Sequence, residues 1–329
     1  MIAEDDRVAG GPPDRLAAQA VERAPILWNP NAGVKAGVRI GRTTREELHT
    51  LLERHGLRGP LYETRSREDA IERVGRFAEA GAELIIGAGG DGTISTIATR
   101  LIGTDVAVGI LPLGSLMNVA RSLGIPRDPV AAAAIIRDAG VTRIDAGRIG
   151  ERVFFEVASI GLSAALMREA QRASRGRYGA LVDAMRVLAR YRSAWFELDL
   201  DDRRERVRGL VVSVANAPYT GFNMTLAPNA RIDDGLLDVV VFEGYARSEF
   251  VRHALAILAG RRAASPRLST YRARSVTVTT DRPLPCRADA ADCGTTPVTI
   301  EVIPHAARFV VPLRPGARVA WGDAPSDAG

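Results

Sequence analysis

The residues whose spacing points most directly to chemistry lie between Leu84 and Ala98, in the run LIIGAGGDGTISTIA. An apolar stretch leads into four closely spaced glycines, and a helix is expected to open at Thr93. These glycines are Gly87, Gly89, Gly90 and Gly92. Glycine lets the backbone approach a phosphate closely, and the free N–H groups of a helix start point toward it. The turn therefore predicts a phosphate site, with a plain strand-to-helix turn as the alternative.

Asp91 places a carboxylate inside this turn. The glycines also fit the G-x-G-x-x-G pattern of dinucleotide-binding domains, although that pattern alone has low specificity. A pyrophosphate without a metal would be repelled by Asp91, and the next strand ends in Leu111–Pro112 with no acidic residue placed for a ribose. A carboxylate among phosphate-binding amides favours Mg²⁺ or its waters. A dinucleotide-dependent oxidoreductase is thus kept only as a remote alternative.

The elements around this turn alternate between strand and helix. Apolar runs predict strands at 26–29, 83–87 and 106–111, and helical periodicity predicts helices at 43–55, 67–80, 93–102 and 129–138. Strands separated by helices of this length form a parallel, doubly wound sheet through right-handed crossovers. The first half is therefore predicted to be an α/β domain.

The second half of the chain has a different pattern, dominated by short β-rich runs. These runs lie at 153–157, 194–200, 207–215, 237–243, 275–280 and 298–303. Helical stretches interrupt them at 164–190 and 247–263. The predicted organisation is a disordered segment (1–22), an α/β nucleotide-binding domain (23–150), a mainly antiparallel β domain (151–312) and a tail (313–329) that returns to the first domain.

Composition limits the class of protein. The chain has 329 residues, 46% hydrophobic and 25% charged, which is ordinary globular usage and excludes a wholly disordered protein. No stretch approaches the roughly 18 apolar residues of a membrane-spanning helix. The first twenty residues have no apolar signal-peptide core, so a cytoplasmic location is expected. Cys286 and Cys293 are expected to be reduced thiols, because they form neither a disulfide framework nor a metal motif.

Several motifs occur together in an order that resembles the diacylglycerol kinase catalytic-domain superfamily, which includes bacterial lipid kinases and sphingosine kinases. The matching segments are Asn29-Pro-Asn-Ala-Gly33, Gly89-Gly-Asp-Gly-Thr93, Pro112-Leu-Gly-Ser115 with Ala120-Arg121, Asn216, Ala227-Pro-Asn-Ala230 and Asp233-Asp-Gly-Leu-Leu-Asp238. Together they cover the chain from about Ile26 to Pro312. The resemblance implies an α/β nucleotide domain followed by a β-sandwich lipid domain.

The resemblance also implies an activity and a set of site residues. Family members transfer the γ-phosphate of ATP to a lipid hydroxyl, with Mg²⁺ neutralising the phosphates. The implied nucleotide-binding residues are Asn29, Gly33, Lys35, Thr64, Gly89, Gly90, Asp91, Gly92, Thr93, Ser95 and Ser115. The implied metal ligands are Asp234 and the backbone carbonyls of Arg231 and Leu236. The Asp-Asp-Gly sequence there is also a hairpin signal by itself, and a turn is compatible with a metal site.

The chain departs from the family pattern on the catalytic side. The family has Asp-Gly-Glu before Gly-Thr-Thr-Pro, and its Glu is taken as the general base. Ala291 occupies that Glu position here, which leaves Asp289 and Asp292 as candidate catalytic carboxylates. Loss of a general base typically costs about 10²–10⁴-fold in rate. Met117–Asn118 and Ser95–Thr96 also replace the family's Asn-Asp and Asn-Glu pairs.

The predicted function is an ATP-dependent lipid kinase acting on a hydroxyl such as that of diacylglycerol, weakened by Ala291. The alternative is a catalytically inactive nucleotide- or lipid-binding member of the same fold. The expected partner is a lipid at the membrane surface and not a nucleic acid, with peripheral attachment to the inner membrane face. A second copy of the chain, forming a homodimer, is a further candidate partner. An arginine-rich segment could attract anionic headgroups, or be a solvated helix face. Its members are Arg168, Arg172, Arg175, Arg177, Arg186, Arg190 and Arg192.

Overall fold

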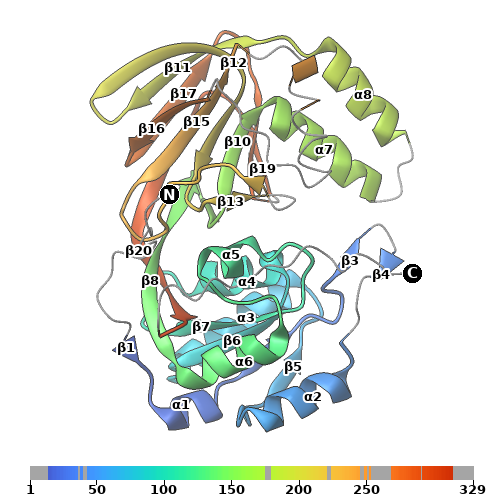
Figure 1. Ribbon diagram of the computed structural model, residues 1–329, viewed down its shortest axis with the longest axis vertical. Helices are drawn as coiled ribbons and strands as arrows, with labels where there is room; N and C mark the ends of the chain where they lie inside the picture. The colour runs from blue at the N-terminus through green and yellow to red at the C-terminus, as the bar shows by residue number, and fades with distance from the viewer. Residues whose placement is uncertain are drawn as a thin grey trace, which may run out of the picture. The chain divides into compact units, whose positions relative to one another are not determined.

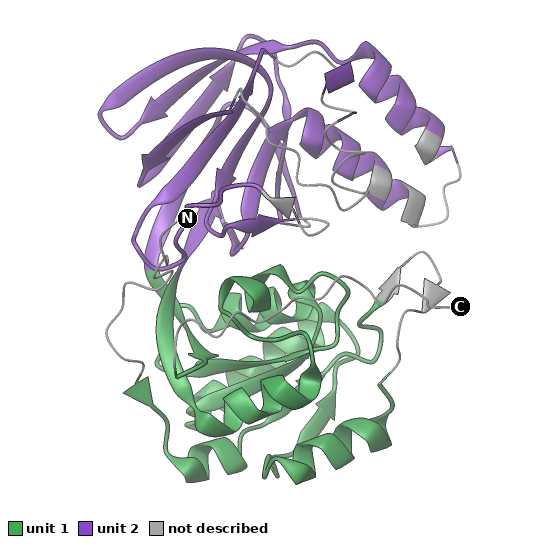
Figure 2. Ribbon diagram, viewed as in Figure 1, with its two compact units in different colours: residues 1–34, 39–144, 305–329 green, residues 35–38, 145–304 purple. Residues whose placement is uncertain are grey.

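The computed structural model describes residues 14–35, 38–39, 43–174, 179–220, 224–244, 248–249, 252, 268–289 and 291–313. The chain divides into two compact units (Figure 2), one of residues 1–34, 39–144 and 305–329 and the other of residues 35–38 and 145–304. The chain passes between the units within β8 (Gly140–Ile149) and β20 (Val298–Val311), and also at positions 34–35 and 38–39. The predicted helix at 247–263 lies almost wholly outside the described residues.

Unit 1 is built on a parallel sheet (Figure 1). Its strands are β2 (Ile26–Trp28), β5 (Leu61–Glu63), β6 (Leu84–Gly89) and β7 (Ala107–Pro112), in the order β7-β6-β2-β5. Every residue of β6 and β7 is buried, as expected for strands covered by helices on both faces. The carboxyl-terminal part of β20 extends this sheet by pairing in parallel with β7. The prediction of a doubly wound α/β fold is confirmed.

Unit 1 contains six helices among the described residues, and local capping residues start two of the longer ones. They are α1 (Ala18–Glu22), α2 (Arg45–Arg54), α3 (Arg67–Glu79), α4 (Asp91–Arg100), α5 (Asn118–Ser122) and α6 (Pro129–Asp138). Thr44 and Glu47 form a capping box at the start of α2, and Asp128 caps α6 ahead of Pro129. The helix predicted from Thr93 in fact begins at Asp91, because Gly90 is already the extended N-cap residue.

Residues 14–22, which the sequence assigned to a disordered segment, form β1 (Asp14–Arg15) and α1. β1 pairs antiparallel with β8, and Val21 of α1 is buried. Strand pairing with β8 and burial of the apolar Val21 therefore hold this segment against unit 1. Residues 1–13 lie outside the described part of the chain.

Unit 2 is mainly antiparallel. Its strands are β9 (Arg152–Phe154), β10 (Val157–Gly161), β11 (Ala194–Leu200), β12 (Arg203–Ala215), β13 (Tyr219–Thr220), β14 (Met224–Thr225), β15 (Leu237–Glu243), β16 (Leu268–Ala273), β17 (Ser275–Thr280), β18 (Pro285–Ala288) and β19 (Ala291–Thr295), with β20. Its helices are α7 (Leu162–Ser174) and α8 (Ala180–Arg190). The short strands β3 (Val34–Lys35) and β4 (Val38–Arg39) form a separate pair.

Alternating apolar residues of the unit 2 strands form two buried clusters. One contains Phe196, Leu198 and Ile300, and the other contains Leu210 and Val240. Leu166 of α7 and Val187 and Leu188 of α8 pack against the second cluster. The antiparallel second domain is thus confirmed, although the sequence predicted 153–157 as one strand and 164–190 as one helical stretch.

Candidate functional site

The carboxyl ends of β2 and β6 lie side by side at the point where the chain reverses its direction across the sheet. β2 pairs with both β5 and β6, and the chain runs outward to β5 before it returns to β6. In doubly wound sheets, ligands bind at this switch point, outside the carboxyl ends of the strands. Asn29 follows β2 and Gly90 follows β6, so the two predicted phosphate-binding segments meet there.

Asn29 links these two segments directly. Its side-chain Nδ2 donates a hydrogen bond to Oγ1 of Thr93 over 3.1 Å, and its backbone N–H donates to the carbonyl of Ala88 over 2.9 Å. The Asn29 Oδ1 accepts from the N–H of Asn31 and shapes the following turn. Asn29 therefore holds the start of α4 against the end of β2.

Thr64 lies at the same edge of the sheet, directly after β5. Its hydroxyl and its backbone N–H both donate to the carbonyl oxygen of Trp28, over 3.1 and 2.8 Å. The residue is buried, so these bonds fix the end of β5 beside the end of β2. The structure thus brings Asn29, Thr64 and Thr93 to one edge of one sheet.

The first turn of α4 provides backbone donors at this edge. Gly90 is the N-cap residue, and no side chain caps the helix there. The first N–H groups of an α-helix have no intrahelical partner, and with the helix dipole they form an anion site. A Cβ added at Gly92 would meet no heavy atom within 4 Å, so the space beside this turn is open. The geometry can accept a phosphate group.

The loop after β7 packs tightly against the glycine-rich turn. The N–H of Leu113 donates to the carbonyl of Gly89 over 3.0 Å, and a Cβ at Gly114 would lie 2.5 Å from Cα of Gly90. Only glycine at position 114 allows the two backbones to approach so closely. Ser115, a predicted nucleotide contact, is half-buried in this loop.

Asp91, which the sequence predicts to favour Mg²⁺ or its waters, makes structural contacts in the fold. Its carboxylate accepts hydrogen bonds from the backbone N–H groups of Met117 and Val119, at 2.7 and 3.4 Å. Burial raises the pKa of the Asp91 carboxyl above its ordinary value, and these backbone hydrogen bonds act in the opposite direction. The carboxylate therefore caps α5 and ties the two loops together.

For three other predicted nucleotide-binding residues, the described part of the structure gives the position but no side-chain contact with this edge of the sheet. Gly33 lies in the turn after Asn29 with a positive φ of 82°. Ser95 is half-buried one turn into α4. Lys35 belongs to β3, but its side chain lies outside the described part of the structure.

The two predicted catalytic carboxylates lie on the hairpin of β18 and β19 in unit 2. Ala288 pairs with Ala291, so Asp289 lies in the tight turn between them. The Asp289 carboxylate accepts hydrogen bonds from the N–H groups of Phe155, Glu156 and Val157, at 3.1–3.2 Å. These bonds bend the chain between β9 and β10, which explains why 153–157 is not one strand. Asp289 thus has the contacts of a structural residue.

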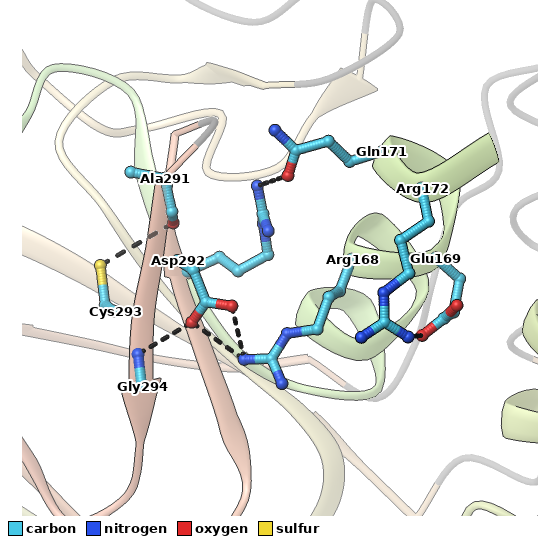
Figure 3. A network of polar contacts seen from close by, with 9 residues as sticks. Arg168, Glu169, Gln171, Arg172, Ala291, Asp292, Cys293 and Gly294 are labelled. Atoms are coloured by element: carbon cyan, nitrogen blue, oxygen red, sulfur yellow. Dashed lines mark hydrogen bonds and ion pairs between the residues drawn. The ribbon is translucent and has the colours of Figure 1, made fainter. Parts of the chain in front are cut away.

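Asp292 is held by an ion pair (Figure 3). Both of its carboxylate oxygens lie within 2.9 Å of Nη2 of Arg168, and one of them also accepts from the N–H of Gly294. Partial burial acts to raise the pKa of Asp292, but the Gly294 N–H and the Arg168 guanidinium outweigh it and lower that pKa. A carboxylate with a lowered pKa is a weak general base.

The predicted metal ligands lie in the turn before β15. Oδ1 of Asp234 accepts from the N–H of Leu236 over 3.1 Å, and Oδ2 pairs with the guanidinium of Arg272. Within the described part of the chain, no group of three or more His, Cys, Asp or Glu side chains is arranged to hold a metal ion. Because Oδ2 of Asp234 is paired with the Arg272 guanidinium, a divalent cation bound by this carboxylate at the turn would have to displace Arg272.

Sequence reasoning missed the partners of these carboxylates. Arg168 and Asp292 are 124 residues apart, and Arg272 and Asp234 are 38 apart. Asp145, which is fully buried and accepts from the N–H of Gly235 over 2.6 Å, was also missed. No local pattern identifies such pairs, because each depends on strand register and helix packing.

Comparisons with known proteins agree with this architecture. Residues 23–149 match the family model of the diacylglycerol kinase catalytic domain, and residues 156–311 match that of the YegS C-terminal NAD kinase beta sandwich-like domain. The crystal structure of a putative diacylglycerol kinase from Bacillus anthracis superposes with a TM-score of 0.68 at 23% identity, covering 88% of this chain and 97% of that one. This likeness concerns the fold.

Relatives in sequence point to the same family. A diacylglycerol kinase of Mycobacterium tuberculosis is 32% identical over 219 residues, which cover 64% of this chain and 71% of that protein. A diacylglycerol kinase of Bacillus subtilis is 28% identical over 246 residues, covering 73% and 80%. With its two matched domains and the glycine-rich turn at the switch point, the chain belongs to the diacylglycerol kinase catalytic-domain superfamily, a family of lipid kinases.

Proposed function

We propose that this lipid kinase uses ATP with Mg²⁺ as its phosphoryl donor and a lipid hydroxyl such as that of diacylglycerol as its acceptor. The observation that carries the proposal is the Asn29–Thr93 hydrogen bond, which joins the ends of β2 and β6 at the switch point of the sheet. The N-terminus of α4, open beside Gly92, supports a phosphate position next to this bond. Mg²⁺ would enter with the nucleotide and neutralise charge on its phosphates.

The reaction would be a direct phosphoryl transfer. The acceptor hydroxyl oxygen forms a bond to the γ-phosphorus, the bond from that phosphorus to the β–γ bridging oxygen breaks, and ADP leaves. The hydroxyl proton must pass to a base. Ala291 offers none, Asp292 is paired with Arg168, and Asp289 is bound to three backbone N–H groups. Removal of the hydroxyl proton is therefore the step for which these three positions offer no free base.

The lack of a free base at positions 289, 291 and 292 favours a second candidate, an inactive nucleotide- or lipid-binding member of the fold. The two candidates share the nucleotide site and differ only in turnover. Incubating the purified full chain with γ-labelled ATP, Mg²⁺ and a total lipid extract separates them. A labelled lipid that forms in the presence of Mg²⁺ and not in its absence supports the kinase and identifies the acceptor. Nucleotide binding without any labelled lipid supports the second candidate.

A thermal-shift comparison tests the nucleotide itself. We expect ATP with Mg²⁺ to raise the melting temperature and NAD to leave it unchanged, because ligand that binds only the folded state stabilises it. Stabilisation by NAD and not by ATP would instead support the remote alternative, a dinucleotide-dependent oxidoreductase.

We propose further that the protein is cytoplasmic and meets its lipid at the inner membrane face through α8. Val182 and Met185, 51% and 65% exposed, lie one turn apart on this helix near the exposed Arg186 and Arg190. Exposed apolar side chains beside arginines suit the surface of an anionic bilayer. Three other arginines of the predicted patch, at positions 175, 177 and 192, add nothing here: the first two lie outside the described residues and Arg192 lies beyond α8. No helix among the described residues is long and apolar enough to cross a membrane.

Vesicle binding tests this surface. The pair Arg186→Glu and Arg190→Glu should reduce sedimentation with phosphatidylglycerol vesicles, and the pair Val182→Ser and Met185→Ser should reduce it in a salt-independent way. The matched control, Arg204→Glu with Arg206→Glu, makes the same charge change at exposed positions on β12. Equal loss in the control pair would show that net charge, and not α8, governs binding.

A further inference from the structure

Arg272 of β16 lies directly opposite Asp238 of β15 in the antiparallel register. Its guanidinium pairs with the carboxylate of Asp234, and its Nε lies 3.7 Å from Oδ1 of Asp238. The side chains of Asp234 and Asp238 are 15% and 9% exposed, whereas that of Arg272 is 45% exposed. One cation that reaches in from the surface thus faces two largely buried carboxylates.

Backbone hydrogen bonds fix the turn that carries Asp234. The N–H of Leu236 donates to Oδ1 of Asp234 over 3.1 Å, and the N–H of Gly235 donates to Oδ2 of Asp145 over 2.6 Å. Asp145 is itself fully buried, and its backbone N–H donates to the carbonyl of Ile232 over 2.7 Å. These three hydrogen bonds hold the backbone of the turn in its shape.

A divalent cation at this turn would compete with Arg272. Mg²⁺ requires near-octahedral oxygen ligands at about 2.0–2.1 Å, and Ca²⁺ takes six to eight at about 2.3–2.6 Å. In the implied ligand set the single carboxylate is that of Asp234, whose Oδ1 accepts from the N–H of Leu236 and whose Oδ2 is paired with Arg272, so a cation binding it must displace that guanidinium. An ion placed there would also face the positive guanidinium at close range, which like-charge repulsion opposes.

We propose that the Arg272 guanidinium takes the place of a divalent cation at the Asp233–Leu236 turn, so that unit 2 holds this turn without a metal. Arginine stays protonated throughout the physiological pH range and is attached to the chain, so its charge cannot be lost by dissociation or chelation. Folding of unit 2 then requires no divalent cation. This inference concerns folding and does not depend on the proposed activity.

Thermal melting of the full chain without nucleotide or lipid tests the proposal. Wild type should melt at the same temperature in EDTA, in MgCl₂ and in CaCl₂. A melting temperature that falls in EDTA and rises again with added Mg²⁺ or Ca²⁺, and that loses this response in Asp234→Asn, would overturn the proposal. ATP is omitted, so failure of nucleotide binding has no effect on the result.

Variants of Arg272 provide the complementary test. Arg272→Ala leaves two largely buried carboxylates without their cation, and we expect a fall of about 2–6 °C in melting temperature. Added Ca²⁺ or Mg²⁺ should restore part of this loss in Arg272→Ala but not in the double variant Arg272→Ala/Asp234→Asn. Arg274→Ala, an exposed arginine two positions along, is the matched control and should melt like wild type.

Two further outcomes complete the test. If Arg272→Ala does not fold, Arg272→Lys is used instead, because it keeps the charge without the planar guanidinium. Arg272→Lys should melt below wild type, and its melting temperature should not change with divalent cations. If Arg272→Ala melts like wild type, the ion pair has no structural role and the proposal is wrong.

Discussion

The carboxylate of Asp91 accepts a hydrogen bond of 2.7 Å from the backbone N–H of Met117, and this contact joins the two loops at the carboxyl ends of β6 and β7. Met117 has a left-handed backbone, with φ 54° and ψ 44°, which residues other than glycine and asparagine adopt only when their surroundings enforce it. Its buried side chain and the Asp91 carboxylate together enforce it here. The acidic residue of the glycine-rich motif therefore organises the site's backbone.

We expect Asp91→Ala to reduce the free energy of unfolding by about 1–3 kcal/mol, because it leaves the N–H groups of Met117 and Val119 without their acceptor. The loops should also separate, so ATP affinity should fall. Urea unfolding and calorimetric titration with ATP measure the two effects. Asp138→Asn, which alters an exposed ion pair with Arg137, is the control. Unchanged urea stability of Asp91→Ala would refute the capping role.

Two glycine substitutions should separate folding from phosphate binding. Gly92→Ala adds a methyl group to open space, so stability should stay within about 0.5 kcal/mol while ATP affinity falls, because the methyl group lies where we place a phosphate. Gly114→Ala drives a Cβ to 2.5 Å from Cα of Gly90 and should cost about 1–3 kcal/mol of stability. If Gly92→Ala binds ATP with the same affinity as wild type, the proposed phosphate position at the N-terminus of α4 is wrong.

Ala291→Glu tests whether the missing base limits turnover. A positioned general base contributes about 10²–10⁴-fold, so we expect the rate of lipid phosphorylation to rise at least about tenfold. Ala291→Gln, of equal size but unable to accept the proton as a carboxylate would, is the control. Equal rates for wild type and both variants would show that proton removal is not limiting.

The Asp292–Arg168 pair should contribute to stability in a pH-dependent way. The pKa of Asp292 is lowered in the folded protein, so its contribution is present above the ordinary pKa of Asp, near 4, and is lost as the pH falls through the lowered value. Asp292→Asn should therefore be less stable than wild type by about 0.2–1 kcal/mol at neutral pH, and equally stable at strongly acidic pH. Urea unfolding across this range measures the difference, and a gap that widens on acidification would contradict the assignment.

Cys293 should be more reactive than the sequence suggests. A hydrogen bond from the Cys286 thiol, with smaller contributions from the Ala288 backbone and Arg152, lowers the pKa of Cys293 to about 7 against the opposing effect of burial. Its alkylation rate should therefore rise with pH to a midpoint near 7, since the thiolate is the nucleophile. Cys286→Ala should move this midpoint toward the ordinary thiol value. Mass spectrometry of the 285–295 region follows the reaction, and the same midpoint in both proteins would refute the thiol pairing.

Local features of this protein follow from neighbouring residues, and the sequence was sufficient to predict the helices at 43–55 and 129–138 and the strand at 83–87. Thr44 and Glu47 cap α2, Asp128 and Pro129 start α6, and the apolar run ahead of the glycines forms the buried strand β6. That the segments proposed to bind the nucleotide would meet was also predictable, because strand ends in a parallel sheet share one edge. The structure then adds the Asn29–Thr93 hydrogen bond between two of them.

The roles of individual carboxylates depended on tertiary structure. Asp91, Asp234 and Asp292 all carry the residue type expected of a site, yet each has a partner that no local pattern reveals: a backbone N–H, Arg272 and Arg168. A carboxylate's chemistry is set by the charges and donors within a few ångströms of it. Those neighbours are brought there by strand register and helix packing across 26 to 124 residues of chain, which composition and spacing do not encode.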